Sequence, residues 1–180
     1  EFIKEFVEQT SKLKTGDPLD KNTDVGPIIV KEELERVENW ISQAKAEGAK
    51  VLFGDKRISD SLLEPTVLLN PSPDSLVSKE EVFGPVVCIY EYDDLESVIE
   101  ECNSLPFAFQ AAIYTKDIDI AMKCSQEMNA STVTVNDHTA FRVDWMPFGG
   151  RDDSGIGVGG IPYSMHEMSR EKLIVIKSEH

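Results

Sequence analysis

The chain has 180 residues, of which 41% are hydrophobic and 28% are charged, and its formal net charge at pH 7 is −15. This size and composition predict a globular protein that buries a substantial core, most simply as one domain. The acidity excludes a nucleic-acid-binding protein and a protein that docks on anionic membranes, because no surplus of cations is present. No apolar run of about 18 residues occurs, so no transmembrane helix is expected.

The chain begins with a helical pattern, "EFIKEFVEQT", and has neither an initiator Met nor a signal-like segment. We interpret it as a helix entered partway, in a protein truncated at its N-terminus, that ends near Gly16 to Pro18. A second helix is predicted over residues 31–46, because Leu34, Val37, Ile41 and Ala44 recur three or four apart. A helix stop and a short strand follow in "AEGAKVLFGD", and another strand is predicted in "LLEPTVLLNP". Pro65 disfavours a central position for the second strand.

From residue 86 onwards, strands and helices alternate. Strands are predicted in "VVCIYEY", "FQAAIYT" and "STVTVND", and helices in "DDLESVIEECNSL" and "KDIDIAMKCSQEM". Asp93 or Asp94 is expected to cap the first of these helices, with Cys102 facing inward. A last helix, "PYSMHEMS", precedes a closing strand, "KLIVIKS". The alternation predicts an α/β fold with a mainly parallel sheet and flanking helices, whose ligands gather at the carboxyl ends of strands. The long loop over residues 136–148 leaves such an end.

The residues that could carry chemistry by themselves give no clear site. Cys88, Cys102 and Cys124 lie in apolar segments without metal or disulfide spacing, which is typical of reduced, unreactive core thiols in a cytosolic protein. The three histidines are scattered, so no metal site is expected, and His138 is interpreted as a hydrogen-bonding loop residue. The glycines of "GGRDDSGIGVGG" follow a loop near the chain end, which excludes a dinucleotide fingerprint and favours close backbone packing.

The stretch "KEEVFGPV" (residues 79–86) places two carboxylates and an aromatic ring before a Gly-Pro turn and a strand. The turn requires Gly84 and Pro85, but it does not require Glu80, Glu81 or Phe83. From the residues alone, the two glutamates are an exposed charge pair at a helix edge.

Two segments together resemble the paired signatures of the aldehyde dehydrogenase superfamily: "KEEVFGPV" and "MPFGGRDDSGIGVGG" (residues 146–160). The likeness runs from the first helix through "GDPLDKNTDVGPII" and "EPTVLLN" to "YSMHEMSREKLIVIK". It implies that residues 1–180 are part of an aldehyde dehydrogenase catalytic domain. The family's cofactor-binding half, its nucleophilic cysteine and its general-base glutamate correspond to segments that this chain does not contain. The chain alone is therefore expected to be inactive.

The resemblance also assigns residues. Glu81 is expected to accept hydrogen bonds from the nicotinamide ribose of NAD or NADP, and Phe83 to pack near the nicotinamide. Phe148 corresponds to an aromatic that lines the aldehyde tunnel, and Phe141 and Arg142 lie on the loop at its mouth. The alternative for Arg142 is a surface ion pair with Asp144, without a role in substrate binding. No catalytic residue and no metal ligand is assigned within the chain.

The implied activity is NAD(P)-dependent oxidation of a small aldehyde to the carboxylic acid through a cysteine thioester. The version "GVGGIPYSMHEMS" resembles members that act on lactaldehyde, glyceraldehyde 3-phosphate or phosphonoacetaldehyde, so an anionic aldehyde is the more specific prediction. The family also implies a cytoplasmic homodimer or homotetramer. Two positions depart from the family pattern: Asp152 stands where a Lys is frequent, and Gly159 stands where a Glu is frequent. A proton-relay role is often ascribed to that Glu, and Gly159 has no side chain to perform it.

Two other functions remain open. One is a non-catalytic assembly module with the same fold, and the other is a CoA-acylating aldehyde dehydrogenase, which releases the thioester to CoA. A cysteine shortly upstream, with a dinucleotide-binding half, would decide for the enzyme. NAD and NADP are not distinguished, because the contact with the 2′-hydroxyl belongs to that half.

Overall fold

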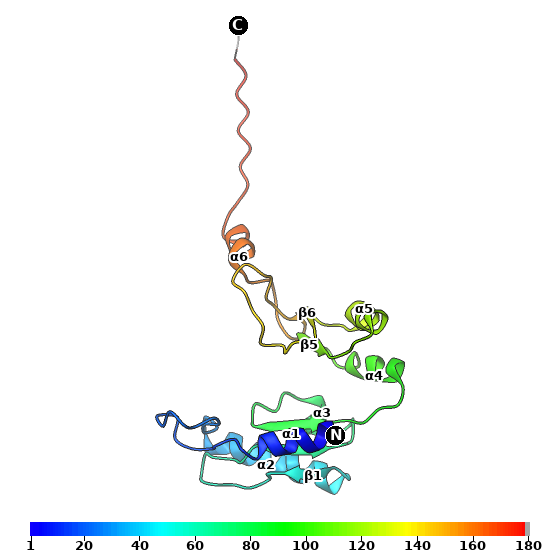
Figure 1. Cartoon of the computed structure of the whole chain (residues 1–180). Coiled ribbons are helices and arrows are strands. Elements are labelled where there is room, and N and C mark those ends of the chain that lie inside the picture. The colour runs from blue at the N-terminus through cyan, green and yellow to red at the C-terminus, as the bar shows by residue number, and fades with distance from the viewer. Residues whose placement is uncertain (179–180) are drawn as a thin grey trace. The chain divides into compact units, whose positions relative to one another are not determined.

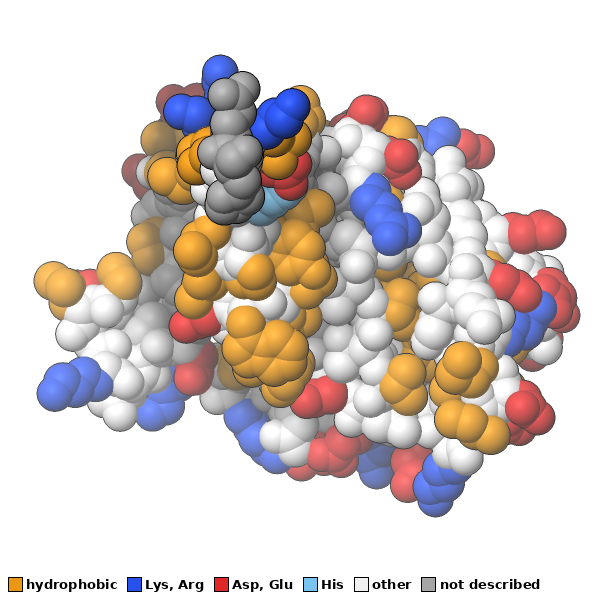
Figure 2. Space-filling model, turned by 90° about the horizontal axis from the view of Figure 1, so that it is seen from above, with side chains coloured by type: hydrophobic (Ala, Val, Ile, Leu, Met, Phe, Trp, Pro, Cys, Tyr) orange, Lys and Arg blue, Asp and Glu red, His pale blue; other side chains and the backbone are white. Residues whose placement is uncertain are grey.

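The computed structural model describes residues 1–178, which form two compact units, Glu1–Glu91 and a second that begins at Tyr92 (Figure 1). Acidic and basic side chains are both spread over the face that Figure 2 shows. Within residues 1–178, no helix combines the length and the apolar character that crossing a membrane requires.

The first unit is built around helix α2. Helix α1 (Phe2–Thr10) buries none of its side chains, whereas α2 (Lys31–Ala46) buries Leu34, Val37, Ile41 and Ala44, as its sequence pattern predicts. These four pack with Ile28, Ala49, Leu63, Leu68 and Val77 into the hydrophobic core of the unit. The acidic residues of the first turn of α2 and Lys45 in its last turn suit the helix dipole. α2 therefore supplies four of the buried side chains in the hydrophobic core of the first unit.

A three-stranded sheet with the order β1-β2-β3 completes this unit. β1 (Lys50–Phe53) pairs antiparallel with β2 (Thr66–Leu69), and β2 pairs in parallel with β3 (Val86–Ile89). The expectation that Pro65 keeps its strand from a central position is wrong. Pro65 lies immediately before the first paired residue, so its missing N–H removes no bond from the ladder. A one-turn helix, α3 (Leu76–Lys79), lies between β2 and β3 and was not predicted.

Gly54 connects β1 to the following loop in a position that excludes a side chain. Its φ is +82°, and a Cβ there would lie 2.1 Å from the carbonyl oxygen of Pro65. Gly54→Ala is expected to lower the free energy of unfolding by about 1–3 kcal/mol, through the clash and the strained φ together. Urea unfolding measures the change. Gly48→Ala is the control, because its φ is +111° but no atom lies within 4 Å of the added Cβ. Equal losses for both variants would contradict the clash.

The second unit contains a βαβ unit. β5 (Gln110–Ile113) and β6 (Thr132–Val135) are parallel, and α5 (Ile118–Glu127) connects them. α4 (Leu95–Cys102) precedes them and is capped by Asp94, whose carboxylate accepts from the Ser97 backbone N–H at 2.8 Å. The Ser97 hydroxyl also donates to this carboxylate, at 2.6 Å, and the hydroxyl and backbone hydrogen bonds together lower the pKa of Asp94. The α/β class with parallel crossovers and flanking helices is confirmed.

The glycine-rich end of the second unit folds back on its beginning. The two-residue strands β4 (Phe107–Ala108) and β7 (Arg151–Asp152) pair antiparallel, and α6 (Ile161–Glu167) follows with Pro162 in its first turn. A Cβ on Gly150 would lie 2.2 Å from the Ser154 carbonyl oxygen, which accounts for a glycine there. Close backbone packing, rather than phosphate binding, explains this glycine.

The predicted closing strand is not formed. Residues 171–178 carry no helix or strand assignment, and Figure 1 shows them as an extended segment after α6. Leu173, Ile174, Val175 and Ile176 are each at least 69% exposed. The prediction relied on the β-branched composition alone, but a strand also needs a partner, and none pairs with this segment among the described residues.

Candidate functional site

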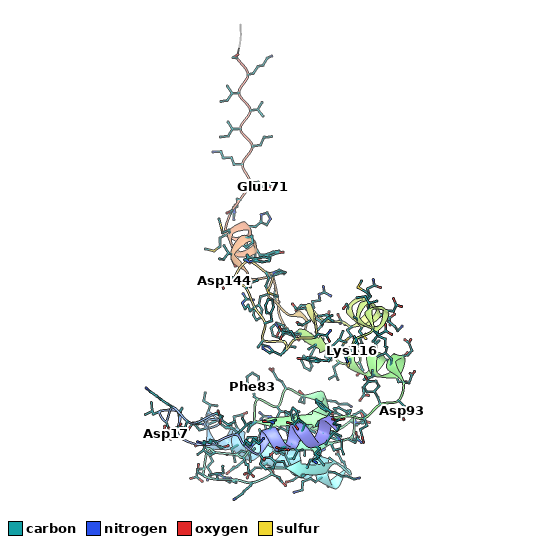
Figure 3. All side chains as sticks on the ribbon, viewed as in Figure 1. Asp17, Phe83, Asp93, Lys116, Asp144 and Glu171 are labelled. Atoms are coloured by element: carbon teal, nitrogen blue, oxygen red, sulfur yellow. The ribbon has the colours of Figure 1, made fainter. Side chains whose placement is uncertain are left out.

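The turn between α3 and β3 presents two of the predicted site residues to solvent. Glu81 and Phe83 are both exposed, and the Phe83 side chain is 74% exposed. Figure 3 shows Phe83 pointing away from the helices and sheet of the first unit. Glu81 forms no hydrogen bond or ion pair within residues 1–178. Both oxygens of its carboxylate are therefore free to accept hydrogen bonds from a ligand.

Phe83 has a strained backbone. Its φ is +47°, whereas the other non-glycine residues with positive φ in residues 1–178 are asparagines and aspartates. Asn and Asp adopt this left-handed region readily, but a bulky aromatic residue seldom does, at a cost of about 1–3 kcal/mol. Strain of this kind gathers at ligand-binding sites, where it holds a side chain in a required position.

The Gly-Pro pair ties the turn to the core of the unit. The Pro85 carbonyl accepts from the Thr66 N–H at 2.8 Å, at the start of the parallel pair β2 and β3. A Cβ on Gly84 would lie 3.1 Å from Cγ2 of Val37, so the turn packs directly on α2. A shallow pocket of about 560 Å³ opens beside it, lined mainly by apolar residues that include Val25, Ile28, Ile29, Phe83 and Pro85. Phe83 thus borders an apolar surface, two residues along the chain from Glu81.

The other predicted site residues lie in the second unit, on the loop after β6. The Arg142 guanidinium carbon lies 4.1 Å from the centre of the Phe148 ring. Phe148 in turn meets the Phe109 ring edge-on, with centroids 5.2 Å apart. Phe148 and Gly159 also exchange two backbone hydrogen bonds, of 3.0 and 2.6 Å. Arg142 and Phe148 are therefore in contact, and their role in lining an opening for the aldehyde stays a prediction.

The remaining predictions for this loop have mixed outcomes. Phe141 is 51% exposed and makes no ring contact with Arg142 or Phe148 among the described contacts. His138 Nδ1 accepts from the Ala140 N–H at 3.1 Å, which confirms a hydrogen-bonding loop role. The ion pair of Arg142 with Asp144 is not found: Arg142 has no carboxylate partner in residues 1–178. Its positive charge is therefore available to an anion.

A comparison with protein families decides what these two groups of residues belong to. Residues 1–174 match the model of the aldehyde dehydrogenase family. The chain belongs to the aldehyde dehydrogenase family. The predicted membership of this family is therefore confirmed, and the α/β fold described above agrees with it.

Individual members of the family are similar over nearly the whole chain. The 3-sulfolactaldehyde dehydrogenase of Priestia aryabhattai is 43% identical over 97% of this chain and 36% of its own length. The lactaldehyde dehydrogenase of Methanococcus maripaludis is 41% identical over 97% of the chain and 37% of its own length. The chain thus spans about a third of the length of these curated relatives.

Two solved structures share the fold of the chain closely. The glyceraldehyde-3-phosphate dehydrogenase GapN of Methanocaldococcus jannaschii, complexed with NADP, has a TM-score of 0.88 and 40% identity, over 94% of this chain and 36% of its own. Aldehyde dehydrogenase 21 of Physcomitrella patens, complexed with the product succinate, has a TM-score of 0.88 and 39% identity, over 93% and 35%.

None of the three cysteines of this aldehyde dehydrogenase chain lies in a setting that activates a thiol. Cys124 is buried and Cys88 is partly buried, and burial raises the pKa of the Cys88 thiol. The expectation that Cys102 faces a closed core is wrong. It is the last residue of α4 and is exposed, lining an open hollow between α4, β5 and α5. Partial burial there and the Glu101 carboxylate raise the pKa of its thiol.

These raised pKa values predict slow alkylation. The thiolate is the reacting form, so Cys88 and Cys102 should react with iodoacetamide at pH 8 more slowly than free cysteine does. Their rates should continue to rise at pH values where the rate for free cysteine has levelled off. Mass spectrometry of each cysteine peptide across a pH series gives both rates. A cysteine that reacts faster than free cysteine at pH 8 would contradict this account.

The two departures from the family pattern have structural explanations. Asp152 has a φ of +52° within β7, and its carboxylate accepts from the Asn129 side chain at 2.8 Å. A Cβ on Gly159 would lie 3.2 Å from the Phe148 carbonyl oxygen, so a larger residue there would press on the loop that holds Phe148. In this chain Asp152 suits a left-handed backbone conformation, and Gly159 allows close packing against the Phe148 backbone. No cluster of three or more metal-ligating side chains occurs in the part of the chain that the structure describes.

Two residues that support these groups escaped the sequence analysis. Phe109 packs on Phe148, and Arg36 donates to the carbonyl of Val82 beside Glu81 and Phe83. Arg36 and Val82 are 46 residues apart. No local periodicity connects residues so distant in the chain, so only the folded structure reveals these contacts.

Proposed function

We propose that this chain forms part of the catalytic domain of an NAD(P)-dependent aldehyde dehydrogenase that oxidises a small anionic aldehyde to the carboxylic acid. In this proposal Glu81 accepts hydrogen bonds from the nicotinamide ribose, and Phe83 limits where the nicotinamide ring lies. Phe141, Arg142 and Phe148 line the entrance for the aldehyde. NAD(P)⁺, when bound, supplies the acceptor for the hydride that leaves the aldehyde carbon.

One observation carries the cofactor part of the proposal. Glu81 and Phe83 share one turn, where the carboxylate has no partner within residues 1–178 and the aromatic ring is held exposed at a φ of +47°. A ribose offers two neighbouring hydroxyl donors, which match the two free acceptor oxygens. The adjacent apolar pocket provides a surface for a ring. The residues present therefore fit a nicotinamide nucleotide.

The substrate class rests on Arg142. Its guanidinium lies over the Phe148 ring at 4.1 Å and lacks a carboxylate partner in residues 1–178. A guanidinium binds planar or tetrahedral oxyanions with two parallel hydrogen bonds. In a chain of net charge −15, a local cation would be needed to attract an anionic substrate. Three of the relatives support this class, since sulfolactaldehyde, glyceraldehyde 3-phosphate and succinate are all anions. The lactaldehyde dehydrogenase relative is named for a neutral aldehyde, so the class rests mainly on Arg142.

The covalent step is proposed to use a cysteine other than Cys88, Cys102 and Cys124. The thioester that forms on it when hydride departs would be hydrolysed by water, which gives the carboxylic acid and restores the thiol. The 180-residue chain alone is accordingly expected to produce no NADH or NADPH from any aldehyde. Absorbance at the nicotinamide wavelength, in material free of any longer form, measures this. Turnover by the isolated chain would overturn the assignment of the three cysteines.

The function itself is tested with the complete protein, NAD⁺ or NADP⁺, and two aldehydes, 3-sulfolactaldehyde and neutral lactaldehyde. We expect formation of one NAD(P)H for each carboxylic acid, with a lower KM for the sulfonated aldehyde. No oxidation of either aldehyde would refute the enzyme and favour an assembly module. Product formation only when CoA is added would favour the CoA-acylating alternative.

A further inference from the structure

The side chain of Arg36, in the middle of α2, reaches the backbone of the Glu81–Phe83 turn. Its Nη2 donates to the Val82 carbonyl oxygen at 2.8 Å. Its Nε donates to the Glu33 carboxylate at 2.9 Å, and its guanidinium carbon lies 4.2 Å from the centre of the Trp40 ring. Nη2 also lies 2.8 Å from the Glu33 carboxylate. The guanidinium is thus fixed on the helix by this ion pair and the Trp40 ring, and it contacts the turn through Nη2.

The hydrogen bond from Arg36 to the Val82 carbonyl restrains the peptide group that precedes Phe83. The Val82 carbonyl belongs to the peptide plane that joins Val82 to Phe83, and rotation of Phe83 relative to that plane is its φ angle. This φ is +47°, a strained value for an aromatic residue. On the other side of Phe83, Gly84 packs against Val37, again on α2. Helix α2 therefore restrains the turn immediately before and immediately after Phe83.

A simple helix ion pair does not explain this arrangement. Arg36 and Glu33 would form an i,i+3 pair on the surface of α2 without any contact to the turn, and such pairs contribute little. Instead, Nη1 of Arg36 is buried and has no hydrogen-bond partner within residues 1–178. A buried unpaired donor is unfavourable. This unpaired donor accompanies the contact between Nη2 and the Val82 carbonyl, which an ion pair on the helix surface would not require.

Arg57 is a second arginine that forms an ion pair with α2, and it provides a comparison for Arg36. Its Nη1 donates to Glu38 of α2 at 3.0 Å, and it also contacts Asp60. Its side chain is 29% exposed, close to the 26% of Arg36. Its hydrogen bonds go to residues outside the Glu81–Phe83 turn.

We propose that Arg36 is a positioning residue for the cofactor-binding turn, which holds the Val82–Phe83 peptide so that Glu81 and Phe83 face the nicotinamide ribose. This inference rests on the proposed function of Glu81 and Phe83. In this proposal the role of Arg36 does not require a contact with the cofactor. Arg36 acts by keeping the turn in its strained conformation before the cofactor arrives, which lowers the ordering cost of binding.

The first test measures cofactor affinity in the complete protein by fluorescence titration with NADH and NADPH. Arg36→Ala should weaken binding of the preferred cofactor about tenfold, with aldehyde KM unchanged, because one charge-assisted hydrogen bond to the turn is lost. Arg36→Lys should recover part of the loss, since an ammonium can donate to Val82 but cannot also keep the fork on Glu33. Arg57→Ala, the matched control, should change affinity less than about twofold.

The second test measures amide hydrogen exchange at the turn in the protein without cofactor. The Thr66 and Val86 N–H groups donate to the carbonyls of Pro85 and Gly84, both at 2.8 Å. In Arg36→Ala their amide hydrogen exchange should accelerate about tenfold, while Leu68 in the same sheet keeps its rate. Arg57→Ala should accelerate neither.

The outcomes separate the two proposals. If Glu81→Gln weakens cofactor binding but Arg36→Ala changes neither affinity nor exchange, the positioning role is wrong and the proposed function stands. If Arg36→Ala accelerates exchange but neither variant changes cofactor affinity, the turn is held by Arg36 but the cofactor assignment fails. Uniformly faster exchange throughout the first unit in Arg36→Ala, with no partial recovery in Arg36→Lys, would make Arg36 a general stability residue and overturn the proposal.

Discussion

Replacing Glu81 with Gln in the complete protein is expected to weaken cofactor binding and slow hydride transfer by about tenfold or more. The substitution preserves the shape of the side chain but removes its charge and one of its two acceptor oxygens. Each hydrogen bond from a ribose hydroxyl to a carboxylate contributes about 1.5–3 kcal/mol, and 1.4 kcal/mol corresponds to a factor of ten. Single-turnover stopped-flow measurements of NAD(P)H formation, with titration of cofactor affinity, measure both effects.

The neighbouring glutamate provides the control for this experiment. Glu80 is also exposed and carries the same charge, but it precedes the turn that holds Phe83. Glu80→Gln should therefore leave both the affinity and the rate close to those of the unmodified enzyme. If Glu81→Gln behaves in the same way as Glu80→Gln, Glu81 is a surface charge and the cofactor site lies elsewhere.

Arg142→Ala is expected to raise the KM for an anionic aldehyde about tenfold or more and to leave a neutral aldehyde of similar length nearly unaffected. The guanidinium has no carboxylate partner in residues 1–178, so the charge is available to the substrate rather than to a neighbour. Steady-state kinetics with 3-sulfolactaldehyde and lactaldehyde provide the comparison.

Loss of packing against Phe148 must be separated from loss of charge. Arg142→Met keeps much of the apolar stem over the ring and removes only the charge, so it should reproduce the selective KM increase. Arg151→Ala removes an exposed cation from β7 in the same unit and should have little effect on either substrate. Equal increases in KM for both aldehydes in Arg142→Ala would reduce Arg142 to a structural residue.

Local sequence rules located the helices well where one face is consistently apolar. The bounds of α2 agree with the prediction at both ends, because four apolar residues at helical spacing become the centre of the core. The rules failed where the outcome depends on a distant partner. Residues 171–178 have strand-forming composition but no pairing strand among the described residues, and Pro65 precedes a central strand without costing it a bond.

The candidate site was accessible only in part from the residues alone. Two adjacent glutamates before Gly-Pro indicate no more than a charged helix edge, and the assignment of Glu81 and Phe83 came from the family resemblance. The strained φ of Phe83 and the hydrogen bond from Arg36 to Val82 are properties of the folded chain. They depend on contacts between segments 46 residues apart, which neither composition nor periodicity specifies.

The most direct measurement is a crystal structure of the complete protein with its preferred nicotinamide cofactor bound. We predict that the Glu81 carboxylate accepts hydrogen bonds of about 2.5–3.0 Å from both hydroxyls of the nicotinamide ribose. Phe83 should contact the nicotinamide end of the cofactor and retain a positive φ. A cofactor whose ribose hydroxyls bind other residues, with Glu81 left in solvent, would contradict the account.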